Sequence, residues 1–146
     1  ILADLVGDQV FLVLRDLWGK SMIINDLLSA RYELGGRGPN SYDCLGLFME
    51  LCKRRGVDIK ADSPKKEADR QTAIFEESER NWLKLDQPES GCAVAIRIGP
   101  WVSHLGMVMD DVNYFIHADE GTGVSVERLD TMRWSKRIAG FYKYVS

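Results

Sequence analysis

The chain has 146 residues, of which 45% are hydrophobic and 28% charged, with a formal net charge of −3. These proportions predict one compact globular domain with a full core and argue against a disordered chain. Charges of both signs are mixed along the sequence and form no basic stripe, so nucleic acid is not expected as a partner. No run of residues is long and apolar enough to cross a bilayer, so no membrane span is expected.

Two helical patterns open the chain. Apolar residues recur at helical spacing from Leu2 to Leu17, and a second pattern begins with Ile23 and includes Leu28. We therefore predict that residues 1–22 form an N-terminal helical extension and that residues 23–146 form the main domain of a single compact unit. The extension would pack on the core or provide a surface for another subunit.

A cysteine at the start of a predicted helix is the most informative feature. Cys44 follows a polar loop over residues 38–43, and the apolar spacing after it predicts a helix that ends near Gly56. Unpaired N–H groups at a helix N-terminus favour a thiolate and can hold an oxyanion, so Cys44 is a candidate nucleophile. A single cysteine is also often only a small buried hydrophobe, which is the interpretation we give to Cys52 and Cys92. Three cysteines are too few for a disulfide framework.

The second half of the chain reads as one helix and then strands. Ser63 and Pro64 predict the start of a partly exposed helix over residues 64–83, whose mixed charges form a solvated face. Turn residues then separate five short predicted strands, at residues 93–98, 104–109, 114–117, 124–128 and 138–144. Helices followed by strands predict an α+β fold, with the N-terminal helices packed on a central antiparallel β-sheet of about five strands.

The two histidines of the chain lie at corresponding ends of successive predicted strands. The polar turn at residues 110–113 predicts a hairpin that brings His104 and His117 together. One ring could then take the proton from Cys44 while the other orients it. Each histidine alone would more often be a core residue, but the joint pattern favours catalysis. Zinc ligation by these three residues is an alternative, although they lack closely spaced ligand pairs, and we expect neither metal nor cofactor.

The order of these motifs resembles that of the NlpC/P60 family of papain-like cysteine peptidases. The resemblance runs from about Asp26 to Tyr144 and rests on residues 30–36, 43–47, 88–96, 104–106 and 117. It implies a papain-like NlpC-type domain in which Cys44 is the nucleophile, His104 the general base and acid, and His117 the orienting group. It also implies that no cofactor takes part.

The resemblance further implies a substrate cleft. Tyr32 and Asp43 would line one wall, and Trp101 the other, although Tyr32 and Trp101 could equally be packing residues. Leu45 stands where the family commonly has a serine that holds the polar end of the substrate peptide. We therefore place Leu45 among the substrate-binding positions and expect it to influence substrate preference.

The implied activity is hydrolysis of peptide bonds in the stem peptides of bacterial peptidoglycan, through an acyl-enzyme on Cys44. The first candidate bond joins the γ-carboxyl of D-glutamate to a diamino acid. The sequence of residues 35–45 resembles the phage or prophage tail-associated branch of the family more than its secreted housekeeping hydrolases. This resemblance makes phage tail proteins candidate partners, which would bind through the N-terminal helix. Two alternatives stay open: a phage tail or cell-wall binding component with weak or no hydrolysis, and a papain-like acyltransferase or amidase with another substrate.

The location of the protein stays open at this stage. The chain begins at Ile1 rather than at methionine, which is consistent with trimming or processing. The resemblance implies action on the bacterial cell wall by a secreted, periplasmic or phage-tail-carried protein.

Overall fold

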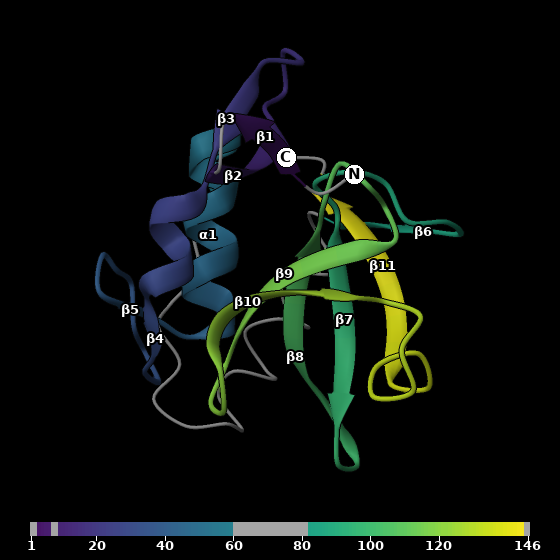
Figure 1. The fold of residues 1–146 in the computed structure, drawn as a ribbon. Helices are drawn as coiled ribbons and strands as arrows, with labels where there is room; N and C mark the ends of the chain where they lie inside the picture. Colours follow the sequence, from purple (N-terminus) through teal and green to yellow (C-terminus); the bar gives the residue numbers. More distant parts are fainter. Residues whose placement is uncertain (1–2, 7–8, 60–81, 145–146) are drawn as a thin grey trace.

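In the described part of the chain, a six-stranded antiparallel sheet with an α-helix packed beside it forms the body of the protein (Figure 1). The computed structural model describes residues 3–6, 9–59 and 82–144. The strand order is β10-β9-β8-β7-β11-β6. The strands are β6 (Trp82–Leu85), β7 (Ala93–Ile98), β8 (Trp101–Val108), β9 (Tyr114–Asp119), β10 (Gly123–Arg128) and β11 (Ile138–Tyr144). The five strands predicted from the sequence are confirmed, although β8 begins before residue 104.

The sheet is buried on both faces because its central strands are nearly continuous apolar runs. Neighbouring residues of a strand point to opposite faces, so Met107 and Ile116 join one core cluster while Val108 and Phe115 join another. The first cluster includes the apolar side of the helix, and the second gathers around Trp134. The sheet therefore separates two cores, and the helix covers only one of them.

Helix α1 (Cys44–Arg55) has the bounds that the sequence predicts because both caps are encoded locally. The side chain of Asp43 accepts a hydrogen bond from the backbone N–H of Gly46, which is the geometry of an N-cap. Gly56 ends the helix in the left-handed region at φ 94°. A Cβ at Gly56 would lie 2.8 Å from the ring of Trp18, so close packing also favours glycine there.

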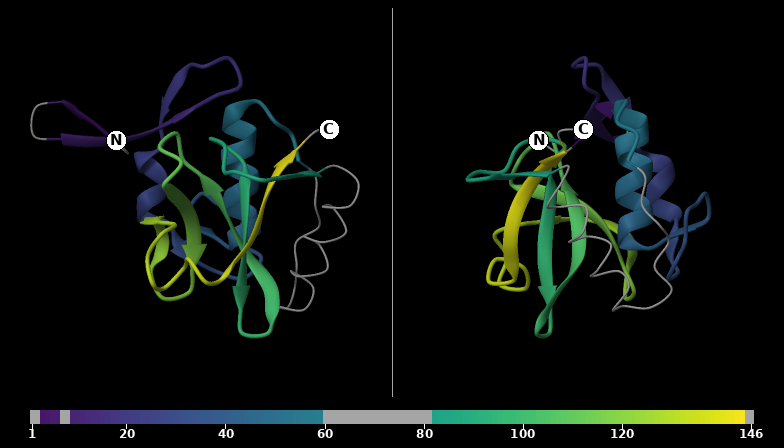
Figure 2. Two further views of the ribbon diagram at one scale, coloured as in Figure 1. Left: turned by 90° about the vertical axis from the view of Figure 1, so that its right-hand side faces the viewer. Right: turned by 180° about the vertical axis from the view of Figure 1, so that it is seen from behind.

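The prediction of N-terminal helices is wrong. Strands β1 (Ala3–Val6), β2 (Gln9–Arg15) and β3 (Ser21–Ile23) form a three-stranded antiparallel sheet, of which β1 and β2 extend away from the main body (Figure 2). The second helical pattern is a short 3-10 helix, η1 (Asn25–Ser29). The run from Val10 to Leu14 is uninterrupted and rich in β-branched and aromatic residues, which suits a strand better than an amphipathic helix. The domain boundary after residue 22 stays a prediction, but any partner surface there is not helical.

The sheet also has one strand more than predicted. Residues 82 and 83 were assigned to the predicted helix at 64–83, yet they begin β6, which pairs with β11 from Trp82 opposite Tyr144 to Leu85 opposite Phe141. Trp82 also packs its ring on Phe48 and Tyr144. Pairing with a distant strand thus overrides the local helical pattern at these residues. The rest of the predicted helix lies outside the described residues.

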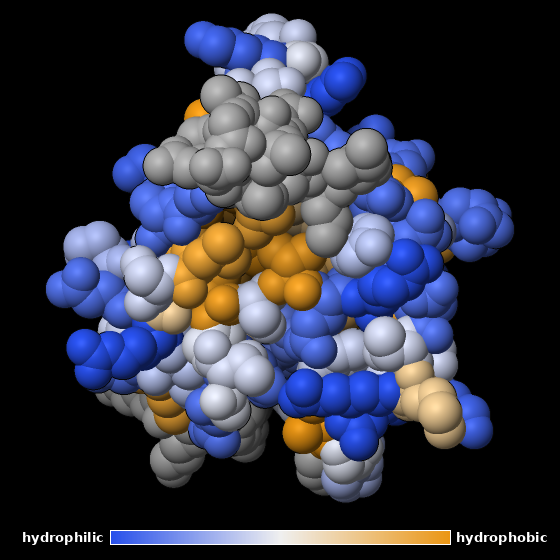
Figure 3. Space-filling model, in the orientation of Figure 1, coloured by the Kyte–Doolittle hydropathy of each residue, from blue (hydrophilic) through white to orange (hydrophobic). Residues whose placement is uncertain are grey.

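Short elements before α1 complete the described part of the chain. Strands β4 (Arg31–Tyr32) and β5 (Ser41–Tyr42) form a small parallel pair that frames the loop leading into α1. Charged and polar side chains border an apolar area near the centre of the face shown in Figure 3, at its sides and below it. Among the described residues, no helix has the length and apolar character needed to span a membrane.

Candidate active site

Cys44 is the first residue of α1 and is buried, with 1% of its surface exposed. Its thiol therefore lies in the first helical turn, where backbone N–H groups lack helical partners and carry partial positive charge. Helix α1 packs against β8 and β9, the two strands that carry the histidines (Figure 1). The fold thus joins the helix of the predicted nucleophile to the strands of the predicted base and orienting group.

The loop before the helix is fastened by the carboxylate of Asp43, which is completely buried. Oδ1 accepts hydrogen bonds from the Gly46 N–H at 2.7 Å and from Arg37 Nη1 at 2.8 Å, and Oδ2 accepts one from the Gly35 N–H at 2.8 Å. A Cβ at Gly46 would collide with the carbonyl oxygen of Gly36, so glycine is needed for this approach. Asp43 thereby holds the Gly-rich loop against the start of α1.

The histidine rings meet as the hairpin predicted. His104 Nε2 and His117 Nδ1 are 2.7 Å apart, and the ring centroids are 5.0 Å apart. Both side chains are almost fully buried. A register shift between Ile96 and Arg97 gives β8 one extra residue just before His104, and such bulges re-aim side chains locally. A Cβ at Gly106 would lie 2.7 Å from the ring of Phe115 and 3.2 Å from the Cβ of His117, so the glycine of the His-x-Gly motif allows β8 and β9 to approach closely beside the histidines.

A fourth polar residue, which the sequence analysis missed, completes the arrangement. Glu127 Oε2 lies 2.5 Å from His117 Nε2. In the β9–β10 pairing, Ser125 is opposite His117, and Glu127 lies two residues further on the same face. Strand alternation could have placed Glu127 on a face of β10, but only the register between the strands identifies His117 as its neighbour.

Glu127 is itself held by residues that follow β10. Its Oε1 accepts a hydrogen bond from the indole N–H of Trp134 at 3.0 Å, and Arg133 Nη1 lies 3.6 Å away. Trp134 is buried, stacks on His104 at 6.1 Å between centroids and meets His117 edge-on at 5.0 Å. A continuous hydrogen-bonded chain therefore runs from Trp134 through Glu127 and His117 to His104.

The pKa shifts agree with this chain of hydrogen bonds. Burial lowers the pKa of His117 below its usual value, outweighing the raising effects of Glu127 and Asp119. Burial raises the pKa of Glu127, but hydrogen bonds from Trp134 and His117 outweigh it and lower the pKa overall. The pair is thus best described as a neutral imidazole that donates to a carboxylate.

The structure places the predicted substrate-binding residues in different surroundings. Tyr32 is half-buried in β4 and packs against the core beside α1. Leu45 is buried in that core, and the carboxylate of Asp43 is engaged within the protein as described above. The side chain of Trp101 lies outside the described part of the structure. Contact of these residues with a substrate stays a prediction.

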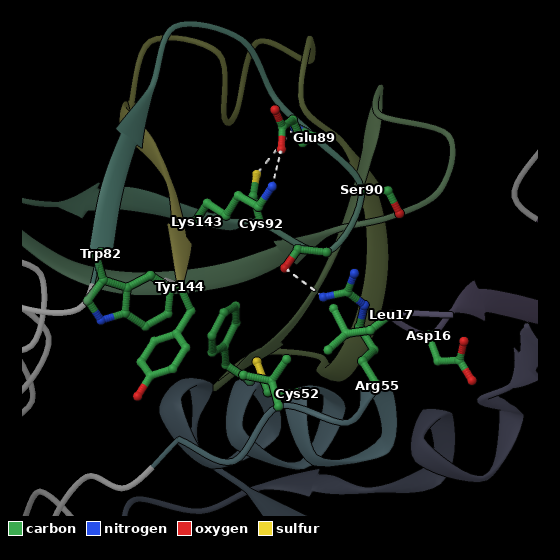
Figure 4. Close-up of a pocket in the computed structure, with 13 residues that line it drawn as sticks. Asp16, Leu17, Cys52, Arg55, Trp82, Glu89, Ser90, Cys92, Lys143 and Tyr144 are labelled. Carbon is green, nitrogen blue, oxygen red and sulfur yellow. Dashed lines mark hydrogen bonds and ion pairs between the residues drawn. The ribbon is translucent and has the colours of Figure 1, made fainter. Parts of the chain in front are cut away.

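The other two cysteines line a pocket beside the opposite end of α1 (Figure 4). This cavity of about 200 Å³ also contains Arg55, which hydrogen-bonds the carbonyl oxygen of Gly91. Burial raises the pKa of Cys52 to about 12 and that of Cys92 to about 11, so both thiols stay protonated near neutral pH. None of the three cysteines, all of which lie in the described ranges, forms a disulfide bond. Their positions suit the interpretation of Cys52 and Cys92 as buried hydrophobes.

No cluster of three or more histidine, cysteine or acidic side chains within the described ranges has the arrangement of a metal site. The geometry instead offers the parts of an activated thiol: a helix N-terminus with a cysteine, a buried imidazole pair and a carboxylate.

We compared the chain with known protein families and solved structures. A model of the NlpC/P60 family matches residues 29–143, well over half of the chain. None of the curated proteins compared with the chain matches it. Similar solved structures include a lipoprotein-like NLP/P60 protein from Staphylococcus aureus, with 17% identity and a TM-score of 0.59. An NlpC/P60 protein from Bacillus cereus has 19% identity and a TM-score of 0.63.

A third similar structure is the NlpC/p60 domain of the peptidoglycan hydrolase SagA, with 20% identity and a TM-score of 0.53. Each likeness covers 82% of this chain, which spans 38% of the Staphylococcus protein, 37% of the Bacillus protein and 89% of the SagA domain. The first two relatives are therefore more than twice as long as the matched region. The chain belongs to the NlpC/P60 family, which includes peptidoglycan hydrolases such as SagA, and it has the papain-like fold of that family.

Proposed function

We propose that the protein is a cysteine endopeptidase that hydrolyses peptide bonds in the stem peptides of bacterial peptidoglycan. The observation that carries the proposal is the buried pair of His104 and His117, hydrogen-bonded at 2.7 Å on the strands against which the Cys44 helix packs. Membership of a family that includes peptidoglycan hydrolases supports the choice of substrate.

In the proposed reaction, His104 accepts the proton of Cys44 and the thiolate attacks the carbonyl carbon of the scissile amide. Backbone N–H groups at the start of α1 stabilise the oxyanion. The C–N bond then breaks, and the amine leaves with the proton from His104, which leaves a thioester on Cys44. Water, deprotonated by His104, attacks the thioester to release the carboxylic acid and restore the thiol. His117 holds the His104 ring throughout.

The finer assignments extend this proposal. The bond between the γ-carboxyl of D-glutamate and a diamino acid is the first substrate to test, since the motif order resembles enzymes of this class. The resemblance of residues 35–45 to the phage or prophage branch makes a phage tail the first assembly to examine for a partner. The three-stranded sheet from β1 to β3 would then be the docking element.

Digestion of purified peptidoglycan and defined muropeptides, followed by mass spectrometry, tests the proposal. Wild type and Cys44→Ala would be compared with Cys92→Ala, which removes a thiol at the other end of the helix. New peptide termini from wild type and Cys92→Ala, but not from Cys44→Ala, are the expected result.

Iodoacetamide labelling separates the outcomes in which no product forms. Rapid alkylation of Cys44 without hydrolysis would overturn the peptidoglycan substrate and point to an acyltransferase or amidase with another substrate. An unreactive Cys44 would overturn the enzymatic function altogether and favour a binding component of the wall or tail.

A further inference from the structure

The two carboxylate oxygens of Glu127 have different partners. Among the described residues, Oε1 faces two donors, the indole N–H of Trp134 at 3.0 Å and the guanidinium of Arg133 at 3.6 Å. Oε2 faces His117 Nε2 at 2.5 Å, with the Ser125 hydroxyl 3.5 Å away. An ionised carboxylate can only accept hydrogen bonds, so His117 Nε2 must carry a proton.

The proton on Nε2 of His117 also determines which nitrogen of His104 is protonated. Because burial favours a neutral His117, a proton on Nε2 places the lone pair of this ring on Nδ1. Nδ1 of His117 therefore accepts the hydrogen bond at 2.7 Å, and Nε2 of His104 donates it. A neutral His104 with its proton on Nε2 is basic at Nδ1. The direction of every hydrogen bond in the chain follows from the charge on one carboxylate.

We propose that Glu127 is a positioning residue that selects the tautomers of both histidines and makes Nδ1 of His104 the nitrogen that receives the Cys44 proton. The proposal rests on the proposed function for the roles of Cys44 and His104. It extends the predicted set of three residues by a fourth, which touches neither the substrate nor the thiol and acts through His117. The buried Trp134 indole fixes the rotamer from which Glu127 does this.

The variant Glu127→Gln tests the proposal sharply because Trp134 fixes its orientation. The carboxamide oxygen must turn toward the indole N–H and Arg133, which can only donate, so the amide NH₂ faces His117 Nε2. His117 Nε2 must then accept, which moves its proton to Nδ1. That proton is donated to His104 Nε2, and the His104 proton moves to Nδ1. Both tautomers therefore reverse in a side chain of nearly unchanged shape.

Nitrogen-15 NMR of this 146-residue chain, labelled at histidine, reads the tautomers directly, because the chain has only two histidines. Wild type should show both rings protonated at Nε2, and Glu127→Gln both at Nδ1. Asp119→Asn is the matched control, because Asp119 also lies near His117 and its Oδ2 accepts a hydrogen bond from Arg133 at 2.9 Å, but its effect on His117 is one of charge alone. It should retain the wild-type tautomers. Against muropeptides, kcat of Glu127→Gln should fall about 10²- to 10⁴-fold, with KM little changed.

The outcomes judge the two proposals separately. A wild-type His117 protonated at Nδ1 would overturn the role of Glu127 even if no variant folds. Unchanged tautomers in a folded Glu127→Gln would do the same, whatever the hydrolytic activity. Reversed tautomers support the role of Glu127. If wild type then hydrolyses no muropeptide, the peptidase function falls while the tautomer selection by Glu127 stands.

Discussion

Replacing Asp43 tests how the loop is fixed to the start of α1. Its buried carboxylate accepts hydrogen bonds from Gly46, Gly35 and Arg37 at 2.7 to 2.8 Å. Asp43→Ala removes the N-cap, at about 1 kcal/mol, and leaves the Gly35 N–H unpaired, at about 1–3 kcal/mol. Arg37 also loses its ion pair, but it is 27% exposed and its charge stays partly solvated. We expect a total loss of about 2–4 kcal/mol in the free energy of unfolding, which overlaps the range of about 3–5 kcal/mol for breaking a buried pair.

Asp43→Asn separates the cap from the charge. Asparagine caps helices about as well as aspartate, so the bond from Gly46 should persist while the amide NH₂ faces the Gly35 N–H. The loss should then be about 1–3 kcal/mol, smaller than for alanine. Urea denaturation measures both values, and the exposed Asp86 provides a control, since Asp86→Ala should change stability by less than about 0.5 kcal/mol. A loss below about 1 kcal/mol in Asp43→Ala, with an unchanged m-value, would refute the reasoning.

Three further predictions concern the thiols, the hairpin and the buried ring. At pH 8, Cys52 and Cys92 should be thiolate at fractions of only about 10⁻⁴ and 10⁻³, so mass spectrometry should find iodoacetamide on Cys44 alone in folded protein and on all three cysteines in denaturant. Gly106→Ala puts a Cβ 2.7 Å from an aromatic ring and 2.9 Å from a backbone oxygen of β9, and urea titration should show a loss of about 1–3 kcal/mol. Because burial lowers the pKa of His117, the unfolded chain binds more protons below about pH 6.5, so stability should decline as the pH falls from 7 to 5, and less so in His117→Asn.

The parts of the fold that the sequence predicted correctly depend on local signals. Asp43 and Gly56 cap α1 through contacts within a few residues, so its bounds could be read directly. The strands from β7 to β11 were predictable because polar turns separate short apolar runs. At the N-terminus, the run from Val10 to Leu14 carries no such signal, because a short apolar run can be helix or strand. Pairing with β1 and β3 decides the matter, and a partner strand is not visible in a local window.

The residues of the candidate site also fall into those that local signals predict and those that only the folded structure reveals. Cys44, His104 and His117 stood out because a cysteine at a helix start and two histidines in one hairpin are patterns of short range. Glu127 was missed because its role depends on a cross-strand register and on Trp134, which follows β10. A glutamate near the end of a strand is ordinarily a solvated charge.

The position of Glu127 also answers a problem of charge in the proposed mechanism. His104 and His117 are only 3% and 1% exposed, so water can do little to stabilise the imidazolium that forms when His104 takes the thiol proton. A carboxylate in direct contact with His104 would pair with that charge but would also raise the basicity of the ring at rest. Glu127 acts instead through a neutral ring, and its side chain is 25% exposed, which lowers the cost of keeping it ionised. In the proposed mechanism, the compensating charge is therefore one hydrogen bond further along the chain from His104, where it can stabilise a transient imidazolium without keeping the ring permanently charged.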